Sequence, residues 1–183
     1  MTDLVYRAAD AVENADAYVA ALLAALGTSD PLKILSDTPD TIRRGTAGLS
    51  ASQLAQAEKP GKWSLVRLVQ HLSDSELVGA FRYRMVLAHD RPAIPGYDQD
   101  RWVERLHRAD DDFAQSFDDF AMYRQANLCL LERTTPMERQ RVMLHAERGE
   151  ESLLQMMRLY AGHDLVHLRQ LDRIRLSVLS SPE

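Results

Sequence analysis

Residues 150–178 read EESLLQMMRLYAGHDLVHLRQLDRIRLSV, and this stretch predicts the longest helix of the chain. The two glutamates at its start and the arginines toward its end suit the two ends of a helix dipole. Residues on the helical period form one line near the apolar edge of this helix: Met156, Tyr160, His163, His167, Gln170 and Ile174. We therefore expect both histidines to face the interior of the protein.

Three other segments carry the same helical period. The first covers about residues 3–26 and ends before Gly27, a residue typical of helix ends. The second begins with Ser64 as its N-terminal cap and extends to about residue 88. The third begins at the acidic residues 110–112 and ends before Pro136. Because Ala and Leu are abundant and no Asn-Gly or Asp-Gly turn is present, the chain is predicted to be all-α.

The connections between the first three helices are long and contain helix-breaking residues. Residues 27–60 include three prolines, among them Pro39, which predicts short helical turns but no further bundle helix. Residues 89–110 include two more prolines, and a connection of this length can cross a whole bundle. The second and third helices therefore need not be antiparallel neighbours.

The composition is that of a single soluble domain, residues 1–183. Lys and Arg number 22 against 27 Asp and Glu, and the net charge of −5 argues against a nucleic-acid partner. The longest apolar stretch, residues 18–26, is about half of the roughly 20 residues that span a bilayer, so we expect no membrane partner. The single cysteine, Cys129, cannot close an internal disulfide, which favours the cytoplasm. Its place between two leucines predicts a buried, inert thiol.

Three of the six histidines form the most informative pattern in the chain. His163 and His167 are four residues apart, so their imidazoles project from one helix face and can chelate one metal ion. His71 lies between Leu68 and Leu72, where an inward polar side chain needs a partner. Together the three imidazoles can hold a metal and leave a fourth tetrahedral position open, as in catalytic zinc sites. The alternative is three core histidines, each bonded to a backbone carbonyl or a carboxylate.

Three runs of sequence resemble the DinB-like superfamily, specifically its YfiT-like metal-dependent hydrolases. These runs are residues 62–64, 71–76 and 162–170. The resemblance implies a four-helix bundle with up-down-down-up topology, a homodimer and a small-molecule substrate. It also implies one divalent metal ion per chain, Zn, Ni or Fe, on His71, His163 and His167. Some relatives in this superfamily are thiol transferases that use a low-molecular-weight thiol.

Three acidic residues lie close in sequence to the expected ligands. Asp74, three residues after His71, is the candidate catalytic residue, either orienting a ligand imidazole or acting as a base at the mouth of the site. Glu76 and Asp164 are further candidates. The alternative for each of the three carboxylates is an ion pair with an arginine, such as Arg67, Arg82 or Arg84.

These features favour a metal-dependent enzyme. The metal acts as a Lewis acid, so a bound water leads to hydrolysis and a bound thiol leads to thiol transfer. The alternative is a non-catalytic, dimeric metal-binding module of a stress response, with a protein side chain in the fourth position. We expect the open position of the metal to face the bundle end reached by residues 89–110 and 136–149, because these connections are long enough to form a pocket wall. His145, in the second of these connections, can approach the open end of the bundle, but as a loop histidine it is expected to be solvated.

Overall fold

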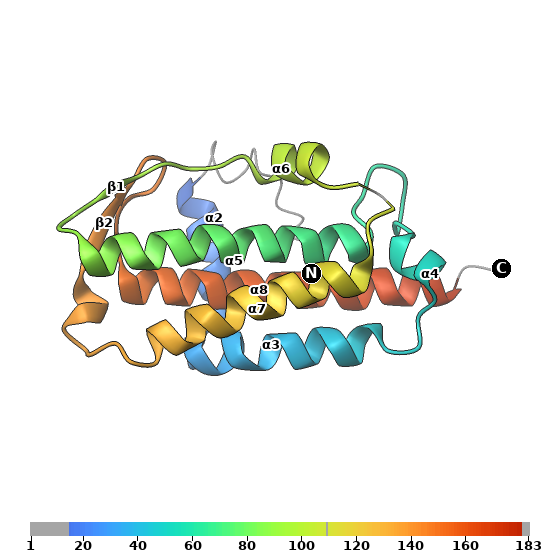
Figure 1. The fold of residues 1–183 in the computed structure, drawn as a ribbon, viewed down its shortest axis with the longest axis horizontal. Coiled ribbons are helices and arrows are strands. Elements are labelled where there is room, and N and C mark those ends of the chain that lie inside the picture. Colours follow the sequence, from blue (N-terminus) through green and yellow to red (C-terminus); the bar gives the residue numbers. More distant parts are fainter. Residues whose placement is uncertain (1–14, 109, 181–183) are drawn as a thin grey trace.

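Four helices lie side by side along the length of the molecule in the computed structural model, which describes residues 15–108 and 110–180 (Figure 1). They are α3 (Pro31–Thr46), α5 (Leu65–Ala88), α7 (Phe113–Leu131) and α8 (Leu153–Ser180). Helices α3 and α8 run in one direction and α5 and α7 in the other (Figure 1). Each helix packs against two others, α5 against α7 and α8, and α3 against α7 and α8. The predicted four-helix bundle with up-down-down-up topology is confirmed.

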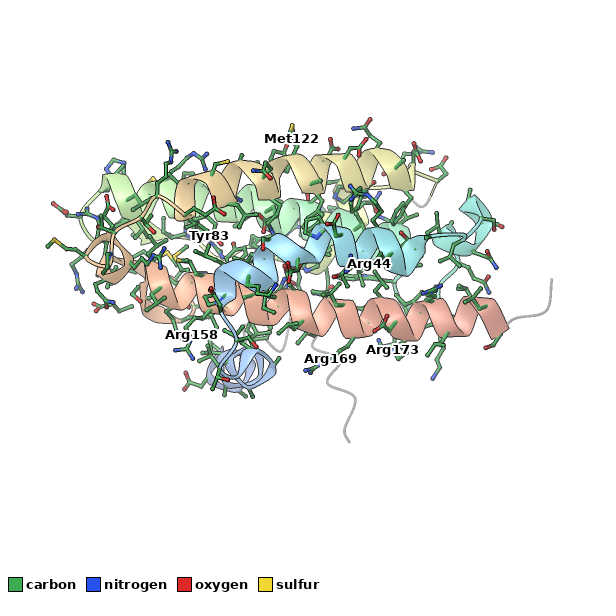
Figure 2. All side chains as sticks on the ribbon, turned by 90° about the horizontal axis from the view of Figure 1, so that it is seen from below. Arg44, Tyr83, Met122, Arg158, Arg169 and Arg173 are labelled. Atoms are coloured by element: carbon green, nitrogen blue, oxygen red, sulfur yellow. The ribbon has the colours of Figure 1, made fainter. Side chains whose placement is uncertain are left out.

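The first bundle helix is α3, and the sequence prediction of a bundle helix over residues 3–26 is wrong. Helix α2 (Ala15–Leu26) covers the described part of that segment and crosses α8 from outside the bundle (Figures 1 and 2). Residues 3–14 of the expected helix lie outside the described residues. The expectation that residues 27–60 hold only short helical turns is also wrong, because α3 alone spans four turns of this segment.

Pro39 was expected to break a helix, yet it lies inside α3. Proline has no N–H and therefore cannot donate to the carbonyl four residues earlier, that of Leu35. The Leu35 oxygen instead accepts a 2.7 Å hydrogen bond from Nη1 of Arg124 on α7. Asp30 caps the start of the helix by accepting from the backbone N–H of Leu32, and Pro31 occupies the first turn, where proline is well tolerated. A tertiary contact thus permits a helix that local propensity disfavours.

Helix α5 begins after Ser64, whose hydroxyl accepts from the Arg67 N–H, as the sequence predicted. The short helix α4 (Ala51–Ala55) lies in the preceding connection and starts with a capping box. After α5 the chain forms the short strand β1 (Ala93–Ile94) and the two-turn helix α6 (Gln99–Leu106). This connection passes along the outside of α5 from one end of the bundle to the other (Figure 1).

The structure contains a small β-sheet, which the prediction of an all-α fold from the sequence did not include. After the 3-10 turn η1 (Glu138–Gln140), β2 (Val142–His145) and β3 (Gly149–Ser152) form an antiparallel hairpin. Strand β1 adds to it in parallel with β2, pairing Ile94 with His145. This pairing buries His145 to 3% exposure, so the expectation of a solvated loop residue is wrong. Helix α8 consequently starts at Leu153, three residues later than predicted.

The interior consists of two apolar clusters separated by a polar layer. One cluster contains Leu35, Tyr83, Leu128 and Met157, and the other contains Ile42, Leu68, Phe120 and Ile174. Each bundle helix contributes to both clusters, so each helix passes through the layer between them. The polar residues of the layer are almost fully buried: Thr38, His71, Glu76, Arg124, Asn127, His163 and Asp164.

The outer faces of the helices are polar with scattered exceptions. Arg158, Arg169 and Arg173 on α8 project away from the bundle, whereas Tyr83 is 1% exposed inside it (Figure 2). Cys129 is also exposed, which corrects the expectation of a buried thiol. Within the described residues no single helix is long and apolar enough to cross a membrane. Helices α2 and α3, bent by 80° at their junction, meet that length and composition only as a pair.

Gly162 allows α2 to approach the backbone of α8. A Cβ built on this residue would lie 2.2 Å from the Leu22 carbonyl oxygen. Gly162→Ala is therefore expected to lower the free energy of unfolding by about 1–3 kcal/mol, the usual cost of overpacking. Urea denaturation followed by circular dichroism measures this change.

Gly45→Ala in α3 is the matched control. Its added Cβ would meet only the terminal Cδ2 of Leu171, which a rotation of that flexible side chain can relieve. Both substitutions gain the same helix propensity, about 1 kcal/mol, so their difference isolates the contact with Leu22. Equal stability of the two variants would contradict the close packing of α2 on α8.

Candidate metal centre

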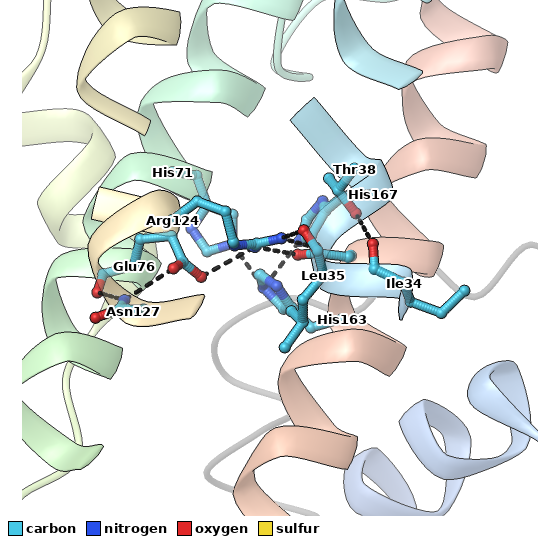
Figure 3. Close-up of polar contacts among 10 residues, drawn as sticks. Ile34, Leu35, Thr38, His71, Glu76, Arg124, Asn127, His163 and His167 are labelled. Carbon is cyan, nitrogen blue, oxygen red and sulfur yellow. Dashed lines mark hydrogen bonds and ion pairs between the residues drawn. The ribbon is translucent and has the colours of Figure 1, made fainter. Parts of the chain in front are cut away.

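The three histidines singled out from the sequence come together in the polar layer (Figure 3). The Nε2 atom of His163 lies 2.9 Å from Nε2 of His71 and 3.1 Å from Nε2 of His167. His71 comes from α5 and the other two from α8, four residues apart on one face. All three donor atoms lie within 4.8 Å of one another. The structure thus assembles the set from two helices that are distant in sequence.

These nitrogen contacts leave the cluster incompletely satisfied by hydrogen bonds. A neutral imidazole nitrogen carries either one proton or one lone pair, so Nε2 of His163 cannot fully serve two neighbouring ring nitrogens. Nδ1 of His167 lies 2.9 Å from Oε1 of Gln170; donation from Nδ1 leaves a lone pair on Nε2 directed at the cluster. A divalent ion fits this donor set, because tetrahedral zinc with Zn–N bonds of about 2.0–2.1 Å places its nitrogen ligands about 3.3 Å apart.

The electrostatic environment keeps the three imidazoles neutral. Burial lowers the pKa of His71 and of His163 well below the usual 6.5, and neighbouring imidazoles lower both further. Burial also lowers the pKa of His167, although its hydrogen bond with Gln170 opposes this effect. Because only the neutral ring coordinates a metal, the cluster is ready to bind one without first losing protons at neutral pH.

Trp63 and Ser64 precede α5, and the indole of Trp63 packs over the cluster. Its ring centroid lies 5.0 Å from that of His71 and 6.3 Å from that of His167, and it is nearly parallel to the latter ring. This wall shields the two imidazoles from water. Nδ1 of His71 is buried, and no described residue accepts a hydrogen bond from it.

Asp74 does not provide that missing partner. Its carboxylate Oδ2 lies 2.8 Å from Nε2 of His107, the residue that ends α6, so Asp74 pairs with that histidine. Burial raises the pKa of Asp74, and the hydrogen bond with His107 acts in the opposite direction. The orienting contact with His71 is thus not formed in the structure. The role of Asp74 as a base stays a prediction.

Glu76 and Asp164 form a buried ionic network with Arg124 of α7 (Figure 3). Nη1 of Arg124 donates to Asp164 at 2.6 Å, and Nη2 donates to Glu76 at 2.9 Å. The amide of Asn127 donates to the other Glu76 oxygen and to its backbone carbonyl. Burial alone would lower the pKa of Arg124, but the two carboxylates more than offset this and raise it.

The alternative of an ion pair with an arginine is confirmed for Glu76 and Asp164, but the partner is Arg124 and not one of the examples Arg67, Arg82 and Arg84. A signal for the correct residue was present. Arg124 and Asn127 follow Phe120 by four and seven residues, which places them on the same inward stripe of α7 as that phenylalanine. A charged residue on an apolar stripe requires an opposite charge from another helix.

A cavity opens beside the histidine cluster. It measures about 70 Å³, space for about five water molecules if each needs about 10–15 Å³. Its lining comes from α2, α5, α8 and both long connections: Tyr18, Leu22, Ser75, Arg82, Tyr97, Gln99, Glu147, Arg148, Leu159, Tyr160 and His163. The expectation that residues 89–110 and 136–149 contribute the pocket wall is confirmed. The participation of α2 was not anticipated.

Fold and site together define a helical-bundle protein with a three-histidine candidate metal centre. The chain belongs to the DinB superfamily, whose family model matches residues 34–171. The family resemblance seen in the sequence is thereby confirmed.

Several bacterial relatives share most of this chain. It is 24% identical over 149 residues to YfiT of Bacillus subtilis, covering 78% of this chain and 82% of that protein. It is 27% identical over 144 residues to a protein of Bacillus licheniformis, covering 77% and 81% of the two chains. Both relatives carry the name "putative metal-dependent hydrolase". The solved structure of Bacillus subtilis YfiT, described as an unusual four-helix bundle, matches 78% of this chain and 84% of its own with a TM-score of 0.69 at 24% identity.

Arg124→Met is expected to lower the free energy of unfolding by about 3–5 kcal/mol, because it leaves two buried carboxylates without their cation. It also removes the donor to the Leu35 carbonyl. Chemical denaturation at pH 7 measures the loss. Arg44→Met is the control, since Arg44 is exposed and, among the described residues, its guanidinium donates one hydrogen bond, to the Thr41 hydroxyl. If Arg124→Met lowers the free energy of unfolding by less than about 1 kcal/mol, the expected contribution of the ionic network to stability is contradicted.

Proposed function

We propose that this protein is a metal-dependent hydrolase that acts on a small molecule at a mononuclear site formed by His71, His163 and His167. The observation that carries the proposal is the convergence of three neutral Nε2 atoms, on the buried His71 and His163 and the half-buried His167, beside a cavity that His163 itself lines. The names of the relatives support it. Among the described residues the cluster contains these three potential ligands and no fourth. That composition favours an open catalytic site over a closed structural one.

The divalent ion proposed for this site, zinc, nickel or iron, would supply a Lewis acid that lowers the pKa of water to about 7. The chain's own residues prepare the site for it. Trp63 keeps water away from two imidazoles, and Gln170 holds His167 with its lone pair toward the cluster. The cavity admits the substrate against His163. Homodimer formation and a cytoplasmic location stay predictions.

A hydrolytic reaction also needs a group that accepts a proton from water. Asp74 is the candidate taken from the sequence, and the structure supplies a second one, Glu147. The carboxylate of Glu147 lines the same cavity as His163 and lies close over Gly96, where no side chain obstructs it. Asp74 is instead held by His107. We assign the proton acceptor to Glu147 in preference to Asp74.

The protein purified without a histidine tag is expected to bind about one divalent metal ion per chain. His163→Ala and His71→Ala should each weaken zinc binding by at least about tenfold, because each removes one of three protein ligands. Elemental analysis and isothermal titration with zinc measure stoichiometry and affinity. His89→Ala, at the exposed end of α5, is the control and should bind zinc like the wild type. Unchanged binding in both cluster variants would refute the proposed site.

The zinc-loaded protein is expected to hydrolyse 4-nitrophenyl acetate faster than the metal-free protein does. Glu147→Gln should lower kcat/KM by about 100-fold, the usual contribution of a general base, while its zinc affinity stays the same. If Asp74→Asn lowers kcat/KM by about 100-fold and Glu147→Gln does not, Asp74 is the proton acceptor instead. Adding cysteine tests the thiol reaction, since metal-dependent turnover that requires the thiol would replace hydrolysis with thiol transfer.

A further inference from the structure

Arg82 is a buried cation in the wall of the cavity that holds His163. Its residue is 5% exposed, and its guanidinium lies 5.8 Å from the centre of the Tyr97 ring. Nη2 donates to the Pro95 carbonyl at 3.2 Å, and the side chain is also hydrogen-bonded to Tyr160. Nε is buried, and no described residue accepts a hydrogen bond from it. The guanidinium therefore retains an unused donor.

No carboxylate in the described part of the chain lies within 4.0 Å of Arg82, in contrast to the two that neutralise Arg124. Arg148, the other arginine of the lining, is held by Glu151 at 2.5 Å. Of the described residues that line the cavity, Glu147 is the one acidic residue, and it is exposed. A buried charge is costly without a counterion, and the described residues supply none to Arg82, so its guanidinium is suited to bind an added anion.

The neutral groups around Arg82 are hydrogen-bond donors as well. Burial raises the pKa of Tyr18 to about 12 and raises those of Tyr97 and Tyr160. These phenols therefore keep their protons at neutral pH. The Ser75 hydroxyl, hydrogen-bonded to Tyr97, lines the same wall. A guanidinium surrounded by hydroxyl groups is well suited to bind an oxyanion.

Arg82 and His71 lie on the same face of α5, eleven residues and three turns apart. This spacing corresponds to about 16 Å along the helix axis, and a helical side chain tilts back toward the N-terminus. The cavity is lined by Arg82 at one position and by His163 of the histidine cluster at another. One small molecule can contact both His163 and the tyrosine wall, because they line one continuous space.

We propose that Arg82, with the hydroxyl groups of Ser75, Tyr97 and Tyr160, forms a binding subsite for an oxyanion, and that the substrate carries a carboxylate or phosphate group. This assignment of substrate class rests on the proposed function, in which the reaction takes place at the histidine cluster. The subsite itself consists of side chains outside that cluster, so anion binding can be measured without a metal.

The test is an NMR titration of the metal-free, ¹⁵N-labelled protein with sodium acetate and, separately, sodium phosphate at pH 7 and constant ionic strength. Backbone signals of Ser75, Arg82 and Tyr97 are expected to shift saturably with at least one anion, and comparison of the two identifies the preferred group. Acetamide, a neutral analogue of acetate, should leave these signals unchanged. Arg82→Gln should raise the dissociation constant of the anion by at least about tenfold, because a charge-assisted hydrogen bond is lost.

Arg84→Gln is the matched control, since Arg84 lies on the same helix but is exposed. It should bind the anion like the wild type. Arg82→Lys, which keeps the charge and loses the planar fork, should bind with intermediate affinity and covers the case in which Arg82→Gln does not fold. The absence of saturable shifts with both anions, or equal affinities of wild type and Arg82→Gln, would overturn the subsite.

The two proposals can fail independently. If the protein binds no metal but binds an anion in a way that depends on Arg82, the subsite proposal is supported and the metal-centre proposal is rejected. Metal binding without anion binding at Arg82 would retain the centre and reject the oxyanion substrate. Anion binding seen only in the zinc-loaded protein, and insensitive to Arg82→Gln, would place the anion on the metal and overturn the subsite.

Discussion

The guanidinium of Arg124 connects all four helices of the bundle. It extends from α7 to the Leu35 carbonyl on α3, Glu76 on α5 and Asp164 on α8, with each partner within 3.1 Å. Such a network is stable in a low dielectric only when every member has its partner, and then it specifies one arrangement strongly. Relative shifts of the four helices are therefore restricted by a single buried side chain.

This network also holds the helices that carry the histidine cluster. Asp164 directly follows His163 on α8, and Glu76 follows His71 by five residues on α5. Both cores above and below the layer are apolar, so a polar site between them must satisfy its own hydrogen bonds. Most atoms of the layer do so within the chain. Nδ1 of His71, Nε of Arg124 and Oδ1 of Asn127 have no hydrogen-bond partner among the described residues. The three Nε2 atoms of the histidine cluster contact one another, and this convergence of lone-pair donors is what makes a metal ion a fitting occupant.

A large share of this arrangement follows from the sequence. Helical periodicity located α5 and α8 to within three residues at each end, and placed α7 correctly between its aspartate cap and Pro136. The four-residue spacing of His163 and His167, with His71 on an inward stripe, predicted a cluster that the structure brings together. Local patterns suffice for these features because side chains three or four residues apart share a helix face whatever the tertiary context.

The remaining features were decided by contacts between segments distant in sequence. Pro39 disfavours a helix locally because it cannot donate to the Leu35 carbonyl. Helix α3 forms nevertheless, since Arg124, 85 residues after Pro39, donates to that carbonyl instead. His145 is buried because β1 pairs with β2 across the 47 residues between Ile94 and Val142. Sequence alone thus determined α5, α7 and α8 and the inward position of the three clustered histidines. The tertiary structure decided which helices form the bundle, which arginine is neutralised and which one, Arg82, is left facing the cavity, because charge pairing and backbone hydrogen bonding depend on distances in space.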